Sequence, residues 1–119
     1  MSHEAVADGF EESLGRIQSA VARNFSYRII TLQDKGIIAN YESSVQKLFS
    51  SELHQRMSNT GLHGIGLHAM LYDENDDRTP QRARWGTYYL ATVSETIGAG
   101  TSEIQRNIIA TRGLGLPRG

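Results

Sequence analysis

Apolar residues recur at helical spacing over the first third of this sequence. They are Val6, Phe10, Leu14, Ile17, Val21, Phe25, Ile29 and Leu32. Each lies three or four residues after the one before, which places all of them on one face of an α-helix of about seven turns. We therefore expect one long helix that ends near Asp34-Lys35-Gly36, where the glycine is suited to a C-cap.

A second helical run follows Asn40. Asn is a favourable N-cap, and Glu42 would lie in the first turn, where the helix dipole favours a carboxylate. The apolar positions of this run are Tyr41, Val45, Leu48, Phe49, Leu53 and Met57. Because only a short segment joins the two runs, we expect an antiparallel helical hairpin.

The segment after the second run has the composition of a loop. Glycines at 61, 64 and 66 and the acidic stretch 73–77 predict a loop over residues 61–79. Thr79 followed by Pro80 then predicts the N-cap and first residue of a third helix.

Gly98-Ala99-Gly100 should end the third helix, and Thr101 or Ser102 should cap a short last one. The chain has only two prolines and no alternating strand pattern. The sequence therefore predicts an all-α fold, a bundle of three long helices plus a short C-terminal helix.

The composition restricts the class of protein. The chain has 119 residues, a formal net charge of −1 and no cysteine. A near-neutral chain lacks a basic nucleic-acid-binding surface, and the lack of cysteine excludes disulfides, zinc–thiolate sites and cysteine nucleophiles. No apolar run approaches the roughly 20 residues of a membrane helix, and the polar first residues do not resemble a secretion signal. We expect one cytoplasmic domain without nucleic-acid or membrane partners.

The segment Gly98-Ala99-Gly100-Thr101-Ser102 is the first candidate for chemistry. Glycines let a ligand approach the backbone, a helix start presents free N–H groups, and two hydroxyls add donors. The same composition is also typical of a helix–helix corner with an ordinary cap. From the residues alone, both interpretations stay open.

Histidines and carboxylates are weaker candidates. Of the four histidines, His63 and His68 flank a glycine-rich turn, but a metal site needs three or four converging ligands, so we predict none. Glu95 and Glu103 flank the glycine turn, and a general base there would need burial or a charged neighbour. Most carboxylates of this chain should face solvent.

An aromatic group, Trp85, Tyr88 and Tyr89, has two interpretations. The rings would stack on a flat cofactor, or they would pack against the other helices. We favour packing from the residues alone.

The C-terminal part closely resembles a known family. Residues 95–110, ETIGAGTSEIQRNIIA, resemble the last motif of acyl-CoA dehydrogenases, and the continuation RGLGLPR is similar to members from actinobacterial lipid- or steroid-degrading branches. Residues 41–52, YESSVQKLFSSE, are similar to the family's lysine-bearing helix of small residues. The resemblance implies that residues 1–119 form a partial C-terminal helical domain, truncated at its N-terminus, without the first helix of that domain or the β-domain that covers the flavin.

The resemblance implies FAD as the cofactor, bound at a subunit interface, and acyl-CoA as the substrate. Carried over onto this sequence, the cofactor contacts fall on Thr101, Ser102 and Glu103, and Gly100 lies beside the thioester. The segment LHGIG at 62–66 departs from the family's Gln…Gly-Gly pattern, which approaches the FAD of the neighbouring subunit.

Ala99 departs from the family at the catalytic position. Many members have a glutamate there, which removes the α-proton of the thioester. Because alanine accepts no proton, we expect no catalytic residue in this chain. The base would lie on the earlier helix or on the catalytic subunit of a heteromeric enzyme, and Glu95 is a weaker substitute.

The resemblance therefore implies the C-terminal bundle of an FAD-dependent acyl-CoA dehydrogenase, a lipid-metabolism or β-oxidation flavoprotein that performs α,β-dehydrogenation. The bundle would supply homo- or hetero-oligomer packing and part of the FAD site, and it would be inactive alone. Electron-transfer flavoprotein is the candidate electron acceptor. The alternative is a non-catalytic helical oligomerisation or interaction module, or the base-less subunit of a heteromeric dehydrogenase.

Overall fold

The computed structural model describes the backbone of residues 3–118 and the side chains of residues 13–118. Its long helices and short helical segments are α1 (His3–Asp34), α2 (Asn40–Ile65), η1 (Gly66–Met70), η2 (Pro80–Ala83), α3 (Arg84–Glu95), α4 (Ser102–Ile108) and η3 (Ile109–Gly113). Residues 3–118 contain no strand, which confirms the all-α prediction. Within this range, no helix is both long and apolar enough to span a bilayer.

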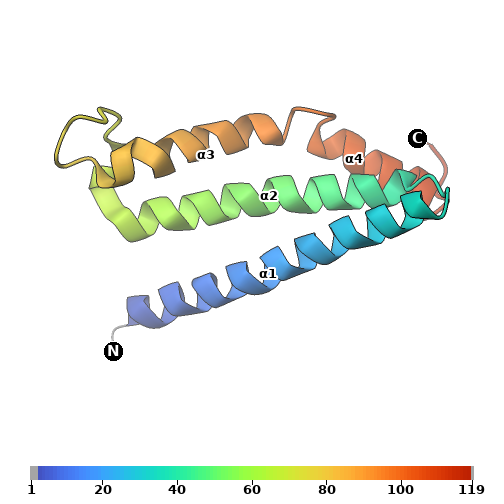
Figure 1. Cartoon of the computed structure of the whole chain (residues 1–119), viewed down its shortest axis with the longest axis horizontal. Coiled ribbons are helices and arrows are strands. Elements are labelled where there is room, and N and C mark those ends of the chain that lie inside the picture. Colours follow the sequence, from blue (N-terminus) through green and yellow to red (C-terminus); the bar gives the residue numbers. More distant parts are fainter. Residues whose placement is uncertain (1–2, 119) are drawn as a thin grey trace.

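The predicted hairpin is formed by α1 and α2, which run antiparallel (Figure 1). α1 ends at Asp34, as predicted, and Gly36 follows with a positive φ of 71°. The Ile37 N–H donates to the Leu32 carbonyl at 2.9 Å and so closes the end of the helix. Phe25 and Phe49 join the two helices in an edge-to-face contact with ring centroids 5.8 Å apart. The side chains of residues 6 and 10, which the predicted apolar face includes, lie outside the described part.

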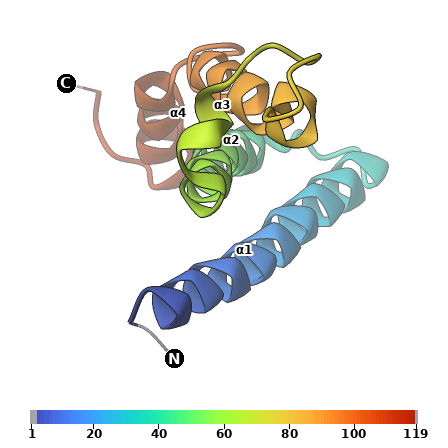
Figure 2. The same ribbon diagram turned by 90° about the vertical axis from the view of Figure 1, so that its left-hand side faces the viewer.

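The central element of the bundle is α2. It contacts α1, α3 and α4, and Figure 2 shows α1 standing apart from the group formed by the other three. The radius of gyration is 17.8 Å, whereas a compact domain of this length has about 13–14 Å. The chain is therefore elongated and open, and α1 leaves much of its surface uncovered.

The buried interior consists mainly of small and polar residues. Leu53, Ala69, Ser51, Ser58 and Thr92 are at most 5% exposed. Large apolar residues are instead partly exposed, and Ile17 at 62% is an example. Small residues let helices approach closely but bury little apolar area, so this interior supplies limited hydrophobic stabilisation.

The predicted loop over residues 61–79 begins too early. α2 continues through Gly61 and Gly64 to Ile65, and a 3₁₀ segment extends to Met70. Gly61 lies in the helix because Trp85 packs against its backbone: a Cβ at residue 61 would be 2.5 Å from the indole ring. Glycine is therefore needed at residue 61 because of a tertiary contact, and it does not end the helix. Gly66, with a φ of 77°, ends the helix.

One predicted cap is wrong, and a second begins only a short 3₁₀ segment instead of the third helix. Ala39 occupies the N-cap of α2 without a side-chain hydrogen bond, and Asn40 is already helical. Thr79 is the N-cap residue of η2 and Pro80 its first residue, without a side-chain hydrogen bond, but residues 81–83 adopt positive φ and α3 starts only at Arg84. Left-handed residues interrupt the right-handed helix that Pro80 would otherwise begin.

Candidate functional site

The chain reverses direction in the turn between α3 and α4. The N–H groups of Ile97 and Gly98 both donate to the Ser94 carbonyl, at 3.1 and 2.8 Å, and close the end of α3. Ala99 and Gly100 then adopt positive φ values of 56° and 95°. Left-handed backbone cannot continue a right-handed helix, so the predicted stop at these residues is confirmed.

Two side chains hold the carbonyl groups of this turn. Lys47 Nζ of α2 donates to the Gly100 carbonyl at 2.6 Å, and Gln105 Nε2 of α4 donates to the Ala99 carbonyl at 2.9 Å. A Cβ on Gly100 would lie 2.7 Å from Gln105 Nε2. Residue 100 therefore requires glycine for two reasons, the positive φ and the nearby Gln105 side chain. The two carbonyl oxygens are directed into the protein.

The amide groups of the same turn are free to bind a ligand. Among the described residues, the N–H groups of Ala99, Gly100 and Thr101 have no hydrogen-bond partner. Successive unpaired backbone N–H groups form a concave site for a carbonyl or anionic oxygen. Ala99 is exposed and Gly100 is half-buried, so solvent reaches the turn.

The predicted cofactor-binding residues begin α4 and differ in exposure. Thr101 caps the helix, because its Oγ1 accepts the Ile104 N–H at 3.3 Å. Hydrogen bonds from the Glu103 backbone N–H and then from the Thr101 hydroxyl lower the pKa of the Glu103 carboxyl. Ser102 is buried at 8% exposure, whereas Glu103 is exposed. Thr101 and Glu103 are thus accessible beside Gly100, and Ser102 is not.

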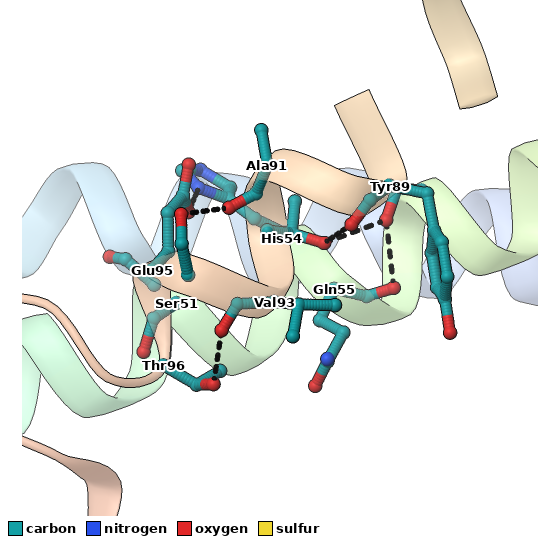
Figure 3. Close-up of polar contacts among 12 residues, drawn as sticks. Ser51, His54, Gln55, Tyr89, Ala91, Val93, Glu95 and Thr96 are labelled. Atoms are coloured by element: carbon teal, nitrogen blue, oxygen red, sulfur yellow. Dashed lines mark hydrogen bonds and ion pairs between the residues drawn. The ribbon is translucent and has the colours of Figure 1, made fainter. Parts of the chain in front are cut away.

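A pocket of about 470 Å³ lies between α2 and the end of α3. Its lining includes Lys47, His54, Glu95 and Ala99. His54 Nδ1 and Glu95 Oε2 are 2.8 Å apart, and both side chains are partly exposed (Figure 3). Tyr88 lies against His54, and burial, followed by the charge of Glu95, raises the pKa of the phenol. The pocket thus brings a carboxylate and an imidazole together beside Ala99, and Tyr88 contacts the imidazole from outside the lining.

A buried polar contact also joins α3 to α2. Ser58 and Thr92 are both 0% exposed, and their hydroxyl oxygens are 3.3 Å apart. Each hydroxyl also lies within hydrogen-bond distance of a carbonyl in its own helix, Gln55 at 3.0 Å and Tyr89 at 2.7 Å (Figure 3). Buried hydroxyls with partners do not carry the desolvation cost of unpaired ones, so the contact fixes α3 on α2.

Trp85 and Tyr88 pack against α2, as the packing interpretation predicts. Trp85 packs against Gly61, and its Nε1 donates to Gln81 Oε1 at 3.1 Å. Tyr88 packs against His54 with ring centroids 6.3 Å apart.

The glycine-rich segment 62–66 forms the last turn of α2 and its C-cap. Its His63 and the nearby His68 are both exposed. Among the described side chains, no three histidine or carboxylate groups converge as metal ligands.

Gln105 and the His54–Glu95 pair were not assigned to the site from the sequence. Gln105 follows Thr101 by four residues, so helical spacing would have placed it beneath the turn. His54 lies 41 positions from Glu95. No local pattern indicates that pair, because only the packing of α3 on α2 brings the two side chains together.

The fold and the turn define the class of protein. Residues 1–114 match the family model described as acyl-CoA dehydrogenase, C-terminal domain, and the chain therefore belongs to the acyl-CoA dehydrogenase family. It is similar to acyl-CoA dehydrogenase IpdE1 of Mycobacterium tuberculosis, with 32% identity over 107 residues, 90% of this chain and 26% of that protein.

A second relative is acyl-CoA dehydrogenase IpdE1 of Mycolicibacterium smegmatis, with 35% identity over 82 residues, 65% of this chain and 18% of that protein. The chain thus spans about a quarter or less of the length of these relatives. No solved structure matches it.

Proposed function

We propose that this chain is the C-terminal bundle of an FAD-dependent acyl-CoA dehydrogenase that performs α,β-dehydrogenation of an acyl-CoA thioester. The bundle supplies one wall of the FAD site and packs against other parts or subunits of the enzyme, and it is inactive alone. Electron-transfer flavoprotein is the proposed electron acceptor. The acyl-CoA dehydrogenase name of both relatives supports the substrate class.

The turn between α3 and α4 is the observation that carries this proposal. Its carbonyls are bound by Lys47 and Gln105, and its three unpaired N–H groups at residues 99–101 suit the oxygen acceptors of a flavin or thioester. Thr101 and Glu103 lie beside them and would hold the cofactor. The Thr101 hydroxyl has one hydrogen to donate, so a flavin oxygen or nitrogen that accepts this hydrogen bond would replace the Glu103 carboxylate as its acceptor. When bound, FAD would accept the hydride that leaves the β-carbon.

The exposed surface supports the packing role. A folded monomer of this mass, 13.2 kDa, exposes about 6,400 Å², whereas this chain exposes 8607 Å². The excess of about 2,200 Å² is comparable to one obligate interface. On α1, Leu14, Ile17 and Val21 are 40%, 62% and 37% exposed. Another helix or subunit should cover this face.

Ala99 supports the alternative, a base-less subunit or a non-catalytic oligomerisation module. A methyl group accepts no proton, so under either proposal the α-proton goes to a residue elsewhere in the assembly. The two proposals differ in whether this chain binds flavin.

Flavin retention tests the proposal directly. The chain is incubated with FAD, free flavin is removed by gel filtration, and the visible spectrum is recorded. We expect a retained flavin band, and its loss in Gly100→Ala, because the added Cβ meets Gln105 Nε2 at 2.7 Å. Gly115→Ala is the matched control: residue 115 also has a positive φ, 69°, but a Cβ there meets nothing within 4 Å.

A colourless wild-type chain that elutes as an oligomer would contradict the FAD proposal and support the alternative. Inactivity is tested separately, with an acyl-CoA and an artificial electron acceptor. If the chain alone measurably reduces the acceptor, the proposed inactivity of the isolated chain is wrong.

A further inference from the structure

The pocket between α2 and the end of α3 is lined mainly by polar residues. Gly98 and Ala99 are the two exceptions, and the other seven lining residues are Gln46, Lys47, Ser50, Ser51, His54, Ser94 and Glu95. The methyl group of Ala99 leaves open the space that a longer side chain would fill. An alkyl chain in this pocket would cover polar groups without replacing their hydrogen bonds to water, which is unfavourable. The pocket therefore suits a ligand with a polar group of its own.

The Glu95 carboxylate determines which nitrogen of His54 carries the hydrogen. Glu95 Oε2 and His54 Nδ1 are 2.8 Å apart (Figure 3). An ionised carboxylate only accepts hydrogen bonds, so Nδ1 of the imidazole is the donor. In the neutral ring the other nitrogen, Nε2, then has a lone pair and no hydrogen. The pair thus presents one defined hydrogen-bond acceptor.

This acceptor is available to a ligand. The side chains of His54 and Glu95 are 45% and 39% exposed. No described residue forms a hydrogen bond with Nε2 of His54. Tyr88 lies against the imidazole with ring centroids 6.3 Å apart. A ring held by a hydrogen bond on one side and an aromatic contact on another loses little entropy when a ligand binds.

The position of His54 relative to the turn indicates which part of a ligand it meets. Lys47 binds the Gly100 carbonyl, and His54 follows Lys47 in α2 by two helical turns, roughly 10 Å along the axis. Under the proposed function, on which this inference rests, the thioester lies beside Gly100. An acyl chain that enters the pocket past Ala99 therefore reaches His54 several carbons from the thioester.

We propose that this pocket selects acyl groups that carry a hydroxyl group several carbons from the thioester, and that His54 Nε2 accepts the hydrogen bond from this hydroxyl. A ketone has no hydrogen to donate, and its oxygen would face the lone pair of Nε2. An unsubstituted chain would leave Nε2 covered and without a partner. His54 contacts the substrate, whereas Glu95 acts through His54 and is a positioning residue.

Three pantetheine thioesters that differ in one group test this selection: heptanoyl, 6-hydroxyheptanoyl and 6-oxoheptanoyl. The full chain is titrated with each at about pH 8, where imidazoles are mostly neutral. NMR follows the amide resonances of residues 99–101 and the imidazole resonances of His54. We expect the hydroxy compound to bind about tenfold more tightly than either of the others, because only it forms the added hydrogen bond.

Long-range proton–nitrogen NMR spectra of the ligand-free chain should show the hydrogen on Nδ1 of His54. In Glu95→Leu the ring loses the partner that fixes this hydrogen, so the nitrogen resonances should change and the preference for the hydroxy compound should fall. A purely structural role of Glu95 would leave those resonances unchanged.

Two substitutions of histidine complete the test. His54→Gln should bind the hydroxy and oxo compounds within about twofold of each other, because a carboxamide both donates and accepts. His68→Gln is the matched control, since His68 is exposed and lies outside the pocket. It should keep the full preference for the hydroxy compound.

Several outcomes would overturn the proposal. They are equal binding of heptanoyl and 6-hydroxyheptanoyl, tighter binding of the ketone, a hydrogen on Nε2 of His54, an unchanged preference in His54→Gln, and no saturation by any thioester at millimolar concentration. Flavin retention separates this failure from that of the proposed function. A chain that retains flavin but does not discriminate refutes only the hydroxyl selection, and a colourless chain that still discriminates refutes only the FAD site.

Discussion

The ammonium group of Lys47 donates a hydrogen bond of 2.6 Å to the carbonyl of Gly100, although the two residues are 53 positions apart in the sequence. This bond connects the first third of α2 to the turn that leads into α4. It directs the Gly100 carbonyl toward α2, so the Thr101 N–H, which lies opposite that carbonyl in the same trans peptide group, points away from Lys47. The orientation of the turn therefore depends on this long-range contact together with the bond from Gln105 to the Ala99 carbonyl.

Removing the ammonium group should destabilise the turn. Lys47→Met keeps the length of the side chain but loses a half-buried, charge-assisted hydrogen bond, and we expect the free energy of unfolding to fall by about 1–2 kcal/mol. Urea denaturation measures this change. Lys35→Met is the control, because Lys35 is exposed beyond the end of α1. A loss of the same size in both variants would show that the Gly100 contact contributes nothing specific.

Two glycines of α2 should respond in opposite directions to alanine. Gly61→Ala places a Cβ 2.5 Å from the Trp85 ring, and the overpacking should cost about 1–3 kcal/mol. Gly64→Ala meets nothing within 4 Å, so its better helix propensity should stabilise by up to about 1 kcal/mol. Thermal denaturation by circular dichroism separates the two. Equal shifts in melting temperature would contradict the contact between Gly61 and Trp85.

Replacing Ala99 by glycine should stabilise the folded chain. Its φ of 56° is unfavourable for a residue with a Cβ, so Ala99→Gly should raise the free energy of unfolding by about 0.5–1 kcal/mol. Ala91→Gly, in the middle of α3, should instead lower it by about 0.5–1 kcal/mol. Denaturant midpoints compare the pair, and a destabilised Ala99→Gly would argue against a left-handed residue 99.

Thr79 has the one buried side-chain polar atom without a partner among the described residues. Thr79→Val keeps the shape and removes an unpaired hydroxyl, so we expect stabilisation of about 1 kcal/mol. Thr92→Val removes a hydroxyl that hydrogen-bonds with Ser58 and with the Tyr89 carbonyl, and it should destabilise by about 1–2 kcal/mol. Calorimetric melting temperatures test both. A destabilised Thr79→Val would indicate that its hydroxyl has a partner.

Glu103 should make stability depend on pH in the acid range. Its own backbone N–H, and then the Thr101 hydroxyl, lower the pKa of the carboxyl in the folded chain below the ordinary 4.5. A lowered folded-state pKa contributes stability that is complete above the unfolded-state pKa and is lost as pH falls through the folded-state pKa.

The difference in melting temperature between wild type and Glu103→Gln should therefore be largest near neutral pH and should shrink as pH falls below 4.5. Glu74→Gln serves as the control, because that carboxylate has no hydrogen-bond partner among the described residues. A difference that stays constant with pH would show that the hydrogen bonds to the Glu103 carboxyl do not stabilise its charged form in the folded chain.

Local signals predicted most of the helices. The apolar spacing over residues 14–32, Gly36 as the end of α1 and Thr101 as a cap act within a few residues, so sequence reasoning found them. One prediction failed where a distant residue decides, and another where the local backbone departs from the expected helix. Gly61 is helical and packs against Trp85 rather than lying in a loop, and Thr79 precedes only the short η2 because residues 81–83 turn left-handed.

The sequence by itself determined the helical class, the family and the tail motif GAGTSE, because periodicity and residue identity are properties of the chain alone. Only the tertiary structure decided which atoms of that motif are available. Lys47 and Gln105 bind its carbonyls, Ser102 is buried, and His54 meets Glu95 across two helices. The reason is physical: hydrogen bonds and burial depend on distance in space, and residues 41 or 53 positions apart meet only when the helices pack.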